Sequence, residues 1–205
     1  MTITVVTPWY EHRELWSDYE KVIADGKPDE VLIVDNGSSP PLDFATMRLA
    51  TNEGFCGGSN AGLKAAHTDA VLFLNNDVKL TRPGWLQTLT GALQPGVLTG
   101  ARLRSDHHTS VDGQPVPYLD GWCLAGMRQD LIELGGFDET LDEPAYFSDN
   151  LICLEARAAG MTLREVRVGL SHFVGATAKQ DPKPHVLEAN HQRYLARARE
   201  LLVTA

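Results

Sequence analysis

The chain has 205 residues, 43% of them hydrophobic and 22% charged, a composition typical of a globular protein rather than a disordered one. Its 18 basic and 27 acidic residues give a net charge of −9, so neither nucleic acid nor an anionic membrane surface is an expected partner. No apolar run approaches the ~20 residues of a membrane span, no signal peptide is recognisable, and the three cysteines form no CxxC motif. We therefore expect one cytoplasmic domain without a transmembrane segment.

Apolar runs and amphipathic segments alternate along the first half of the chain. Hydrophobic patterning predicts strands at residues 3–6, 30–34, 47–50, 71–74 and 96–101, and helices at residues 11–25, 59–66 and 85–93. Ser59 is the expected N-cap of the second helix. The run at 71–74 is the most apolar, which places that strand at the sheet centre. This alternation predicts an α/β fold in which helices cover a mostly parallel sheet.

The second half of the chain lacks this regular alternation of strands and helices. Residues 104–117 are predicted to form a polar loop, and helices are predicted at residues 149–159 and 186–202. Asp106, His107 and His108 resemble a metal-binding cluster, but their place in a polar loop favours ordinary solvation. We interpret the last helix as a packing element or as a wall on the acceptor side.

The glycine-rich residues 54–62 invite comparison with phosphate-binding loops. A Walker A loop requires lysine directly after its second glycine, whereas this chain has Leu63 there and Lys64 one residue late. A dinucleotide-binding fold requires GxGxxG after the first strand, and residues 7–11 contain no glycine. Neither motif is therefore present.

A third arrangement fits the order of the polar residues. Asp35 follows the second strand, the glycine-rich segment follows the third, and Asn75, Asn76 and Asp77 end the most apolar strand. Because open α/β sheets bind ligands beyond the carboxyl ends of their strands, these groups are expected to converge on one nucleotide site. Asp77 suits a hard divalent ion that keeps positions open for diphosphate oxygens.

Seven short segments occur in an order that is typical of one enzyme family. They are TPWY at 7–10, VDNGSS at 34–39, NEGFCGGSNAG at 52–62, LNND at 74–77, GGFDE at 135–139, Asp149 with LEARAAG at 154–160, and HFVG at 172–175. Together they resemble glycosyltransferase family 2, especially its rhamnosyltransferase-like members. The resemblance implies the GT-A fold, a Rossmann-like three-layer α/β/α sandwich. It also implies an inverting transferase of the hexosyltransferase type that uses a nucleotide sugar and Mn²⁺ or Mg²⁺.

The resemblance also implies which residues bind the donor, a UDP- or dTDP-linked sugar. Asp77 and His172 match metal-binding positions, and Asp35 matches a contact to the nucleobase or ribose. The implied donor-binding residues all lie in the segments that follow strands. They are Thr7, Pro8, Tyr10, Asp35, Asn52, Gly57, Asn60, Asn75 and Asn76.

The catalytic base is implied at Asp149, which would take the proton of the acceptor hydroxyl. Asp142 or Glu143 in the preceding loop is the alternative base. Trp122 and Gly126 match the segment that lines the pocket for the sugar and the acceptor, and a flat indole suits stacking on a sugar ring.

The implied organisation is a single domain over residues 1–205. Its parts are a nucleotide-sugar-binding half at 1–103, an acceptor and catalytic half at 104–180, and a C-terminal helix at 181–205. The acceptor is expected to be a glycan, a lipid-linked compound or a protein. Two alternatives stay open: a non-catalytic nucleotide-sugar-binding module, because Ser148 replaces the usual acidic neighbour of the base, and a nucleotidyltransferase of related fold. The latter would carry a glycine- and basic-residue-rich loop that residues 9–13 do not provide.

Overall fold

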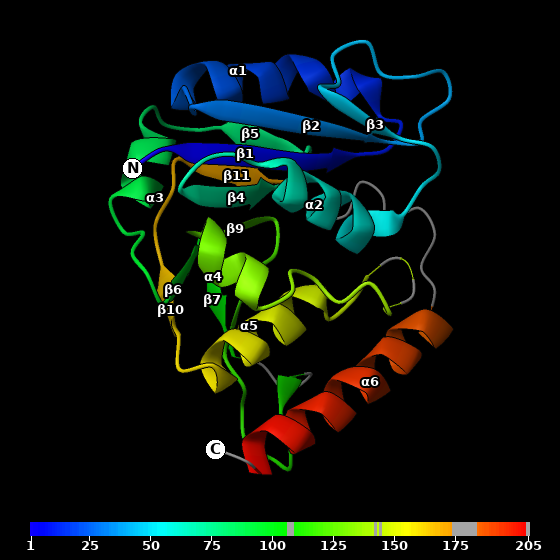
Figure 1. Ribbon diagram of the computed structural model, residues 1–205, viewed down its shortest axis with the longest axis vertical. Coiled ribbons are helices and arrows are strands. Elements are labelled where there is room, and N and C mark those ends of the chain that lie inside the picture. The colour runs from blue at the N-terminus through cyan, green and yellow to red at the C-terminus, as the bar shows by residue number, and fades with distance from the viewer. Residues whose placement is uncertain (106–108, 142, 144, 174–183, 204–205) are drawn as a thin grey trace.

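A seven-stranded sheet forms the centre of the computed structural model, which describes residues 1–105, 109–141, 143, 145–173 and 184–203. The strand order is β10-β6-β9-β4-β1-β2-β3, with β4 in the middle as predicted (Figure 1). The strands are β1 (Ile3–Trp9), β2 (Glu30–Asn36), β3 (Met47–Leu49), β4 (Ala70–Leu74), β6 (Val97–Gly100), β9 (Cys123–Met127) and β10 (Thr162–Glu165). All pairings in this sheet are parallel except those of β9 with β4 and β6. The expectation of a mostly parallel sheet is therefore confirmed.

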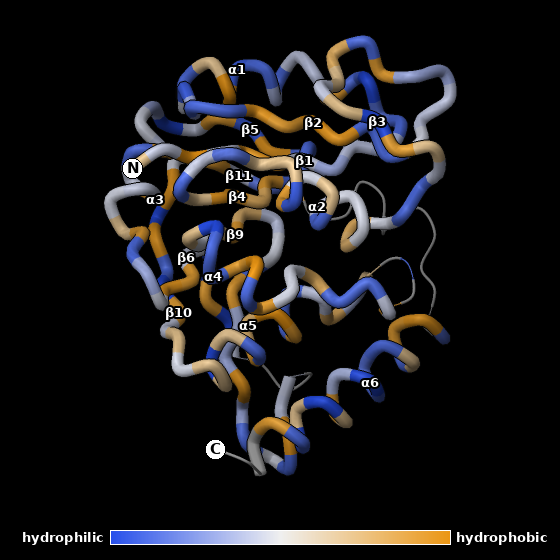
Figure 2. The backbone as a smooth tube through the Cα atoms, in the orientation of Figure 1, coloured by the Kyte–Doolittle hydropathy of each residue, from blue (hydrophilic) through white to orange (hydrophobic). Residues whose placement is uncertain are grey.

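Helices cover both faces of the sheet, which confirms the three-layer α/β/α arrangement. The helices of one face are α1 (Trp16–Gly26) and α3 (Trp85–Thr90), and those of the other are α2 (Gly54–Ala65), α4 (Arg128–Glu133) and α5 (Ser148–Ala158). Side chains of β4 alternate between the two layers, because successive strand residues point to opposite faces. Leu72 and Leu74 pack with α1 and α3, whereas Val71 and Phe73 pack with the helices opposite. Figure 2 shows the resulting hydrophobic interior along β1, β2 and β4.

The last helix, α6 (Pro184–Val203), packs on α5 and forms the outer edge of the molecule (Figure 1). Tyr194 and Ala198 are fully buried there, in one cluster with Leu151 and Leu154 of α5. The Tyr194 hydroxyl also donates a hydrogen bond to the carbonyl oxygen of Thr109 at 2.8 Å. None of the described helices is both long enough and apolar enough to cross a membrane.

Several elements differ from the sequence prediction. Helix α2 begins at Gly54, so Ser59 lies inside the helix, fully buried, and is not its N-cap. The exposed amide of Phe55 in the first turn is instead bonded by the carboxylate of Glu143, 3.0 Å away. Local patterning also missed β9, α4 and β10 and four short strands. These are β5 (Val78–Leu80) paired with β11 (Leu170–His172), and β7 (Leu103–Arg104) paired with β8 (Tyr118–Leu119).

Candidate active site

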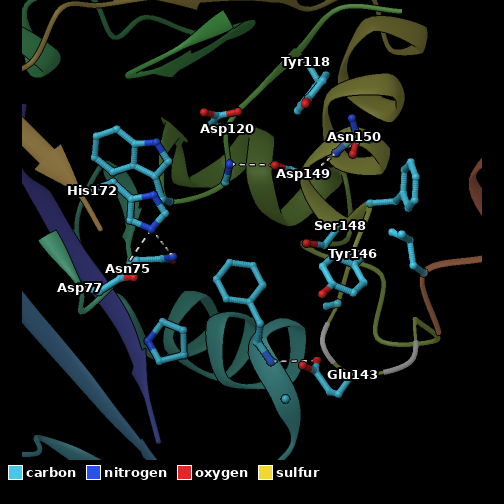
Figure 3. A pocket seen from close by; sticks show the side chains of 18 of the residues that line it. Asn75, Asp77, Tyr118, Asp120, Glu143, Tyr146, Ser148, Asp149, Asn150 and His172 are labelled. Atoms are coloured by element: carbon cyan, nitrogen blue, oxygen red, sulfur yellow. Dashed lines mark hydrogen bonds and ion pairs between the residues drawn. The ribbon is translucent and has the colours of Figure 1, made fainter. Parts of the chain in front are cut away.

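A cleft of about 780 Å³ lies at the edge of the sheet where β1, β2 and β4 end. The segments after these strands form one wall. The opposite wall comes from the residues leading into β9, the start of α5 and the first turns of α6 (Figure 3). The predicted site residues that line the cleft are Pro8, Tyr10, Asn52, Asn75, Asn76, Asp77, Trp122, Asp149 and His172. Most of the predicted residues are thus brought together, although they come from distant parts of the sequence.

Asp35 and Thr7 do not line the cleft, contrary to the expected contacts with the nucleotide. Asp35 is fully buried and accepts hydrogen bonds from the amides of Ser38 and Leu42, at 2.9 and 3.1 Å, and from Arg48. Burial opposes its charged form, but these donors outweigh burial and lower the pKa of Asp35. Thr7 is buried and its hydroxyl bonds that of Tyr19. Both residues therefore stabilise the fold behind the cleft.

The cleft-facing residue at the end of β2 is Asn36, the neighbour of Asp35. Successive residues of a strand point to opposite sides, so the position next to Asp35 faces the site. The Asn36 amide donates to the carbonyl oxygen of Gly54 at 2.8 Å and accepts from the amide of Glu53 at 2.9 Å. Asn36 thus fixes the loop that leads into α2.

Gly57, Asn60 and Gly126 also lie away from the cleft. The Asn60 side chain accepts from the amide of Phe137 at 2.9 Å and donates to its carbonyl oxygen at 2.8 Å. An added Cβ at Gly126 would lie 2.9 Å from Leu98 Cδ2, so this glycine serves close packing. Gly57 faces its own helix turn, where a Cβ would lie 2.7 Å from Glu53 Cβ. Asn60 and Gly126 hold the fold together behind the site, and Gly57 packs on its own turn.

Asp77 and His172, the two residues predicted to bind a metal, face each other across the end of β4. Asp77 is 8% exposed, and no hydrogen bond satisfies its Oδ1 in the described part of the chain, although His172 Nε2 lies 3.0 Å away. Asn75 Nδ2 lies 3.3 Å from the same Nε2. Because an amide NH₂ group can only donate, the Nε2 that faces it is the ring nitrogen without a hydrogen, and its one lone pair either accepts this hydrogen bond or binds a metal. A buried carboxylate oxygen beside such an imidazole nitrogen fits a divalent cation.

The protein offers this cation few ligands. Among the described residues, no group of three or more His, Cys, Asp or Glu side chains could hold a metal. A metal held by Asp77 and His172 would therefore need further ligands from a bound substrate or water. The indole of Trp122 stacks on the His172 ring, with centroids 5.1 Å apart and an interplanar angle of 8°, and fixes its orientation.

Asp149 lies in the first turn of α5, opposite Asp77 and His172 (Figure 3). Its Oδ2 accepts from the amide of Gly121 at 3.1 Å, and its Oδ1 from the amide of Asn150 at 3.0 Å. Burial of the carboxylate raises its pKa to about 6; the amide of Gly121 partly offsets this rise, and the nearby Asp120 adds to it. A carboxylate with this pKa is suited to accept a proton near neutral pH.

The sequence did not single out several residues that line the cleft. They are Asn36, Phe55, Arg104, Thr109, Tyr118, Asp120, Tyr146, Phe147, Asn150, Leu187, Glu188 and His191. Asp120 forms an ion pair with Arg104, with 2.5 Å between Oδ1 and Nε. Most of these residues follow the polar loop or belong to α6, and they carry no recognisable motif.

The alternative base Glu143 also borders the cleft, where its carboxylate bonds the start of α2. Asp142 lies outside the described residues, as do Asp106, His107 and His108. The end of the last family segment, Val174 and Gly175, also lies outside them.

Comparison with known proteins agrees with this geometry. Residues 5–137, more than half of the chain, match the sequence profile of glycosyl transferase family 2. The pre-mycofactocin glycosyltransferases of two Mycobacterium tuberculosis strains, CDC 1551 / Oshkosh and H37Rv, are each 26% identical over 202 aligned positions. The alignment covers 82% of this chain and 42% of theirs, so the chain spans less than half the length of these relatives.

Solved structures show the same fold. The mannosyltransferase PcManGT from Pyrobaculum calidifontis, in complex with GDP-Man and Mn²⁺, gives a TM-score of 0.63 at 17% identity over 99% of this chain and 74% of its own. GalNAc-T7 with UDP, GalNAc and Mn²⁺ gives 0.64 at 13% identity, over 95% and 50% of the two chains. S. aureus TarS gives 0.58 at 17% identity, over 97% and 43%. The expected GT-A fold is therefore confirmed.

The raised pKa of Asp149 predicts a pH-dependent effect of Asp149→Asn on stability. Because folding raises this pKa from an unfolded value near 3.8 to about 6, ionised Asp149 destabilises the wild type as the pH rises through 6. The variant's free energy of unfolding, relative to wild type, should therefore increase by about 2 kcal/mol between pH 4 and pH 7.5. Urea titrations at both pH values measure this, with Asp43→Asn on the exposed surface as the matched control. A difference that does not change with pH would contradict the raised pKa.

Proposed function

This chain belongs to glycosyltransferase family 2, and from that premise we propose that it transfers a sugar from a nucleotide-sugar donor to an acceptor hydroxyl. The observation that carries the proposal is the shared cleft, in which the pair Asp77 and His172 faces the carboxylate of Asp149. Residues 1–103 would supply most of the donor site. The base and the acceptor side would come from residues 104–180 together with α6. The donor is a UDP- or dTDP-linked sugar, and the relatives of known structure that bind UDP or GDP-Man together with Mn²⁺ support a diphosphate donor.

The donor would lie along the ends of β1, β2 and β4. Pro8 near the end of β1, Tyr10 just after it and Asn52 before α2 line the part of the cleft suited to the nucleoside. Asp77 and His172 would hold Mn²⁺ or Mg²⁺, which neutralises charge that develops on the leaving diphosphate. Asn75 and Asn76 supply neutral amides beside that position, so they can bond phosphate or ribose oxygens without adding charge.

Asp149 would act as the general base of a single displacement, which inverts the anomeric carbon. The acceptor oxygen attacks the sugar as Asp149 takes its proton, so the base stands on the side opposite the leaving diphosphate. The amides of Gly121 and Asn150 hold one carboxylate oxygen each, at 3.1 and 3.0 Å, and so fix the direction of the carboxylate. Its pKa of about 6 leaves the carboxylate ionised at neutral pH and basic enough to accept the proton.

Loss of the base should separate chemistry from donor binding. Asp149→Asn removes the proton acceptor but leaves Asp77 and His172 in place. We expect transfer to fall by at least ~100-fold, while the Kd for UDP in Mn²⁺ changes less than about twofold. Turnover of the donor and calorimetric titration of UDP measure the two quantities. Undiminished turnover in the variant would remove Asp149 from the mechanism and favour Glu143 as the base.

Nucleotide binding tests the proposed function itself. UDP, dTDP and GDP are titrated into the wild type with and without Mn²⁺, and we expect UDP or dTDP to bind more tightly when Mn²⁺ is present. Asp77→Ala should abolish the gain from Mn²⁺, because the described residues include no group of three or more His, Cys, Asp or Glu side chains that could hold the ion instead. The exposed Asp43→Ala serves as the control. Binding that Mn²⁺ does not strengthen would contradict the assignment. Binding without turnover of any nucleotide sugar would favour the non-catalytic module.

A further inference from the structure

Asn150, the residue after the proposed base, has a buried amide without a partner. The residue is 6% exposed and borders the cleft, and the described part of the chain offers its Nδ2 no hydrogen bond acceptor. Buried polar groups are nearly always hydrogen-bonded, because an unsatisfied donor destabilises the folded state. A donor left unpaired at the wall of a cleft is therefore expected to find its acceptor on a ligand.

The position of Asn150 indicates which substrate it meets. Figure 3 shows it beside Asp149, on the side away from Asp77 and His172. The proposed base removes a proton from the acceptor, not from the donor. A side chain that flanks the base on the side away from the metal-binding pair therefore faces the acceptor.

The surrounding surface is aromatic. Phe147 stacks on His191 of α6, with ring centroids 4.9 Å apart and an angle of 12°, and on Tyr194 at 5.3 Å and 20°. Tyr118 and Tyr146 complete this side of the cleft. Rings held in place by their neighbours offer flat apolar surface next to the polar groups, as in sites for hydroxylated rings.

The charges on this side disfavour an anion. Asp149 and Glu188 both border it, and Asp120 is paired with Arg104. Among the described residues that line the cleft, Arg104 is the one Lys or Arg side chain, and its charge is already compensated by Asp120. A phosphate or carboxylate on the acceptor would therefore be repelled by the base without gaining a free cation.

We propose that Asn150 Nδ2 donates a hydrogen bond to an oxygen of the acceptor, and that this subsite takes an uncharged hydroxylated ring, a sugar residue. The inference rests on the proposed function, because it assigns the acceptor of that transfer. It names a specificity-determining residue outside the donor and metal sites. Asp149 and Asn150 would then act on the same molecule, one as proton acceptor and the other as hydrogen bond donor.

Simple sugars serve as probes of this subsite. Methyl α-D-glucopyranoside, methyl α-D-mannopyranoside, methyl α-D-galactopyranoside and methyl α-L-rhamnopyranoside are titrated into the chain with UDP and Mg²⁺ present. Glucose 6-phosphate is the anionic comparison, and ligand-observed NMR measures each Kd. We expect at least one methyl glycoside to bind the wild type more tightly than glucose 6-phosphate does.

Asn150→Leu removes the donor while keeping a similar shape. Its Kd for that glycoside should rise about tenfold, which is the effect of one lost hydrogen bond. Asn150→Gln keeps an amide, so its Kd should lie between those of the wild type and Asn150→Leu. The melting temperature should not fall, because Nδ2 has no partner to lose. Gln129→Leu, which removes an exposed amide on α4, is the matched control.

Three results would overturn the inference: a glycoside Kd that Asn150→Leu leaves unchanged, tighter binding of glucose 6-phosphate than of every methyl glycoside, or no glycoside binding by the wild type. The Kd for UDP, measured on the same samples, should be equal in wild type and variant. Failure of both UDP and dTDP to bind the wild type would overturn the proposed function, and with it this inference. Absence of glycoside binding by the wild type while UDP still binds would overturn the acceptor assignment alone.

Discussion

Strand β9 runs against its neighbours, and this reversal determines which groups meet in the cleft. Its first residue, Cys123, pairs with Leu74, the last residue of β4. The pairing continues outward, because the amide of Asn75 donates to the carbonyl oxygen of Trp122 at 2.9 Å. The two residues before β9 therefore stand at the edge where the parallel strands end. Gly121 bonds the base from there, and Trp122 stacks on His172, so one short segment positions both halves of the site.

The aspartates of this sheet edge show how local donors decide the charge state of a buried carboxylate. Asp35 receives two backbone amides and a guanidinium, and these outweigh burial, so its pKa is lowered. Asp149 also receives two backbone amides, but burial and the neighbouring Asp120 outweigh them, so its pKa is raised to about 6. The environment of Asp35 keeps its carboxylate ionised, and the ionised group holds a loop through these hydrogen bonds. The second leaves a carboxylate able to exchange a proton, which a general base requires.

The sequence predicted those strands and helices that leave a regular local pattern along the chain. Apolar runs and helical spacing identified β1, β2, β4 and the helices between them, because these contacts follow a regular period along the chain. The start of α2 was missed because the carboxylate that bonds its first turn belongs to Glu143, 88 positions away. β9 was missed because its place between β4 and β6 depends on pairing between distant segments, which short apolar runs do not reveal.

The site was predicted in the same uneven way. Asp77, His172 and Asp149 were predicted because they lie in motifs of the family that the chain resembles, and the structure brings them to one cleft. Asp35 was misplaced because β2 extends to Asn36, and strand alternation then turns Asn36 rather than Asp35 toward the cleft. Asn150 had no motif at all. What distinguishes Asn150 is a buried side-chain amide without a partner among the described residues, and this depends on packing that the sequence does not show.

The proposed transfer requires that Asp77 and His172 hold a cation that also binds the diphosphate of the donor. Pulsed electron paramagnetic resonance of Mn²⁺ bound with UDP tests it most directly, because it detects nuclei in the first coordination sphere. We expect hyperfine coupling to ³¹P and to an imidazole ¹⁴N in the same complex, with the ¹⁴N coupling absent from His172→Gln. Coupling to ³¹P without any ¹⁴N contribution in the wild type, or Mn²⁺ that stays fully hydrated beside UDP, would contradict it.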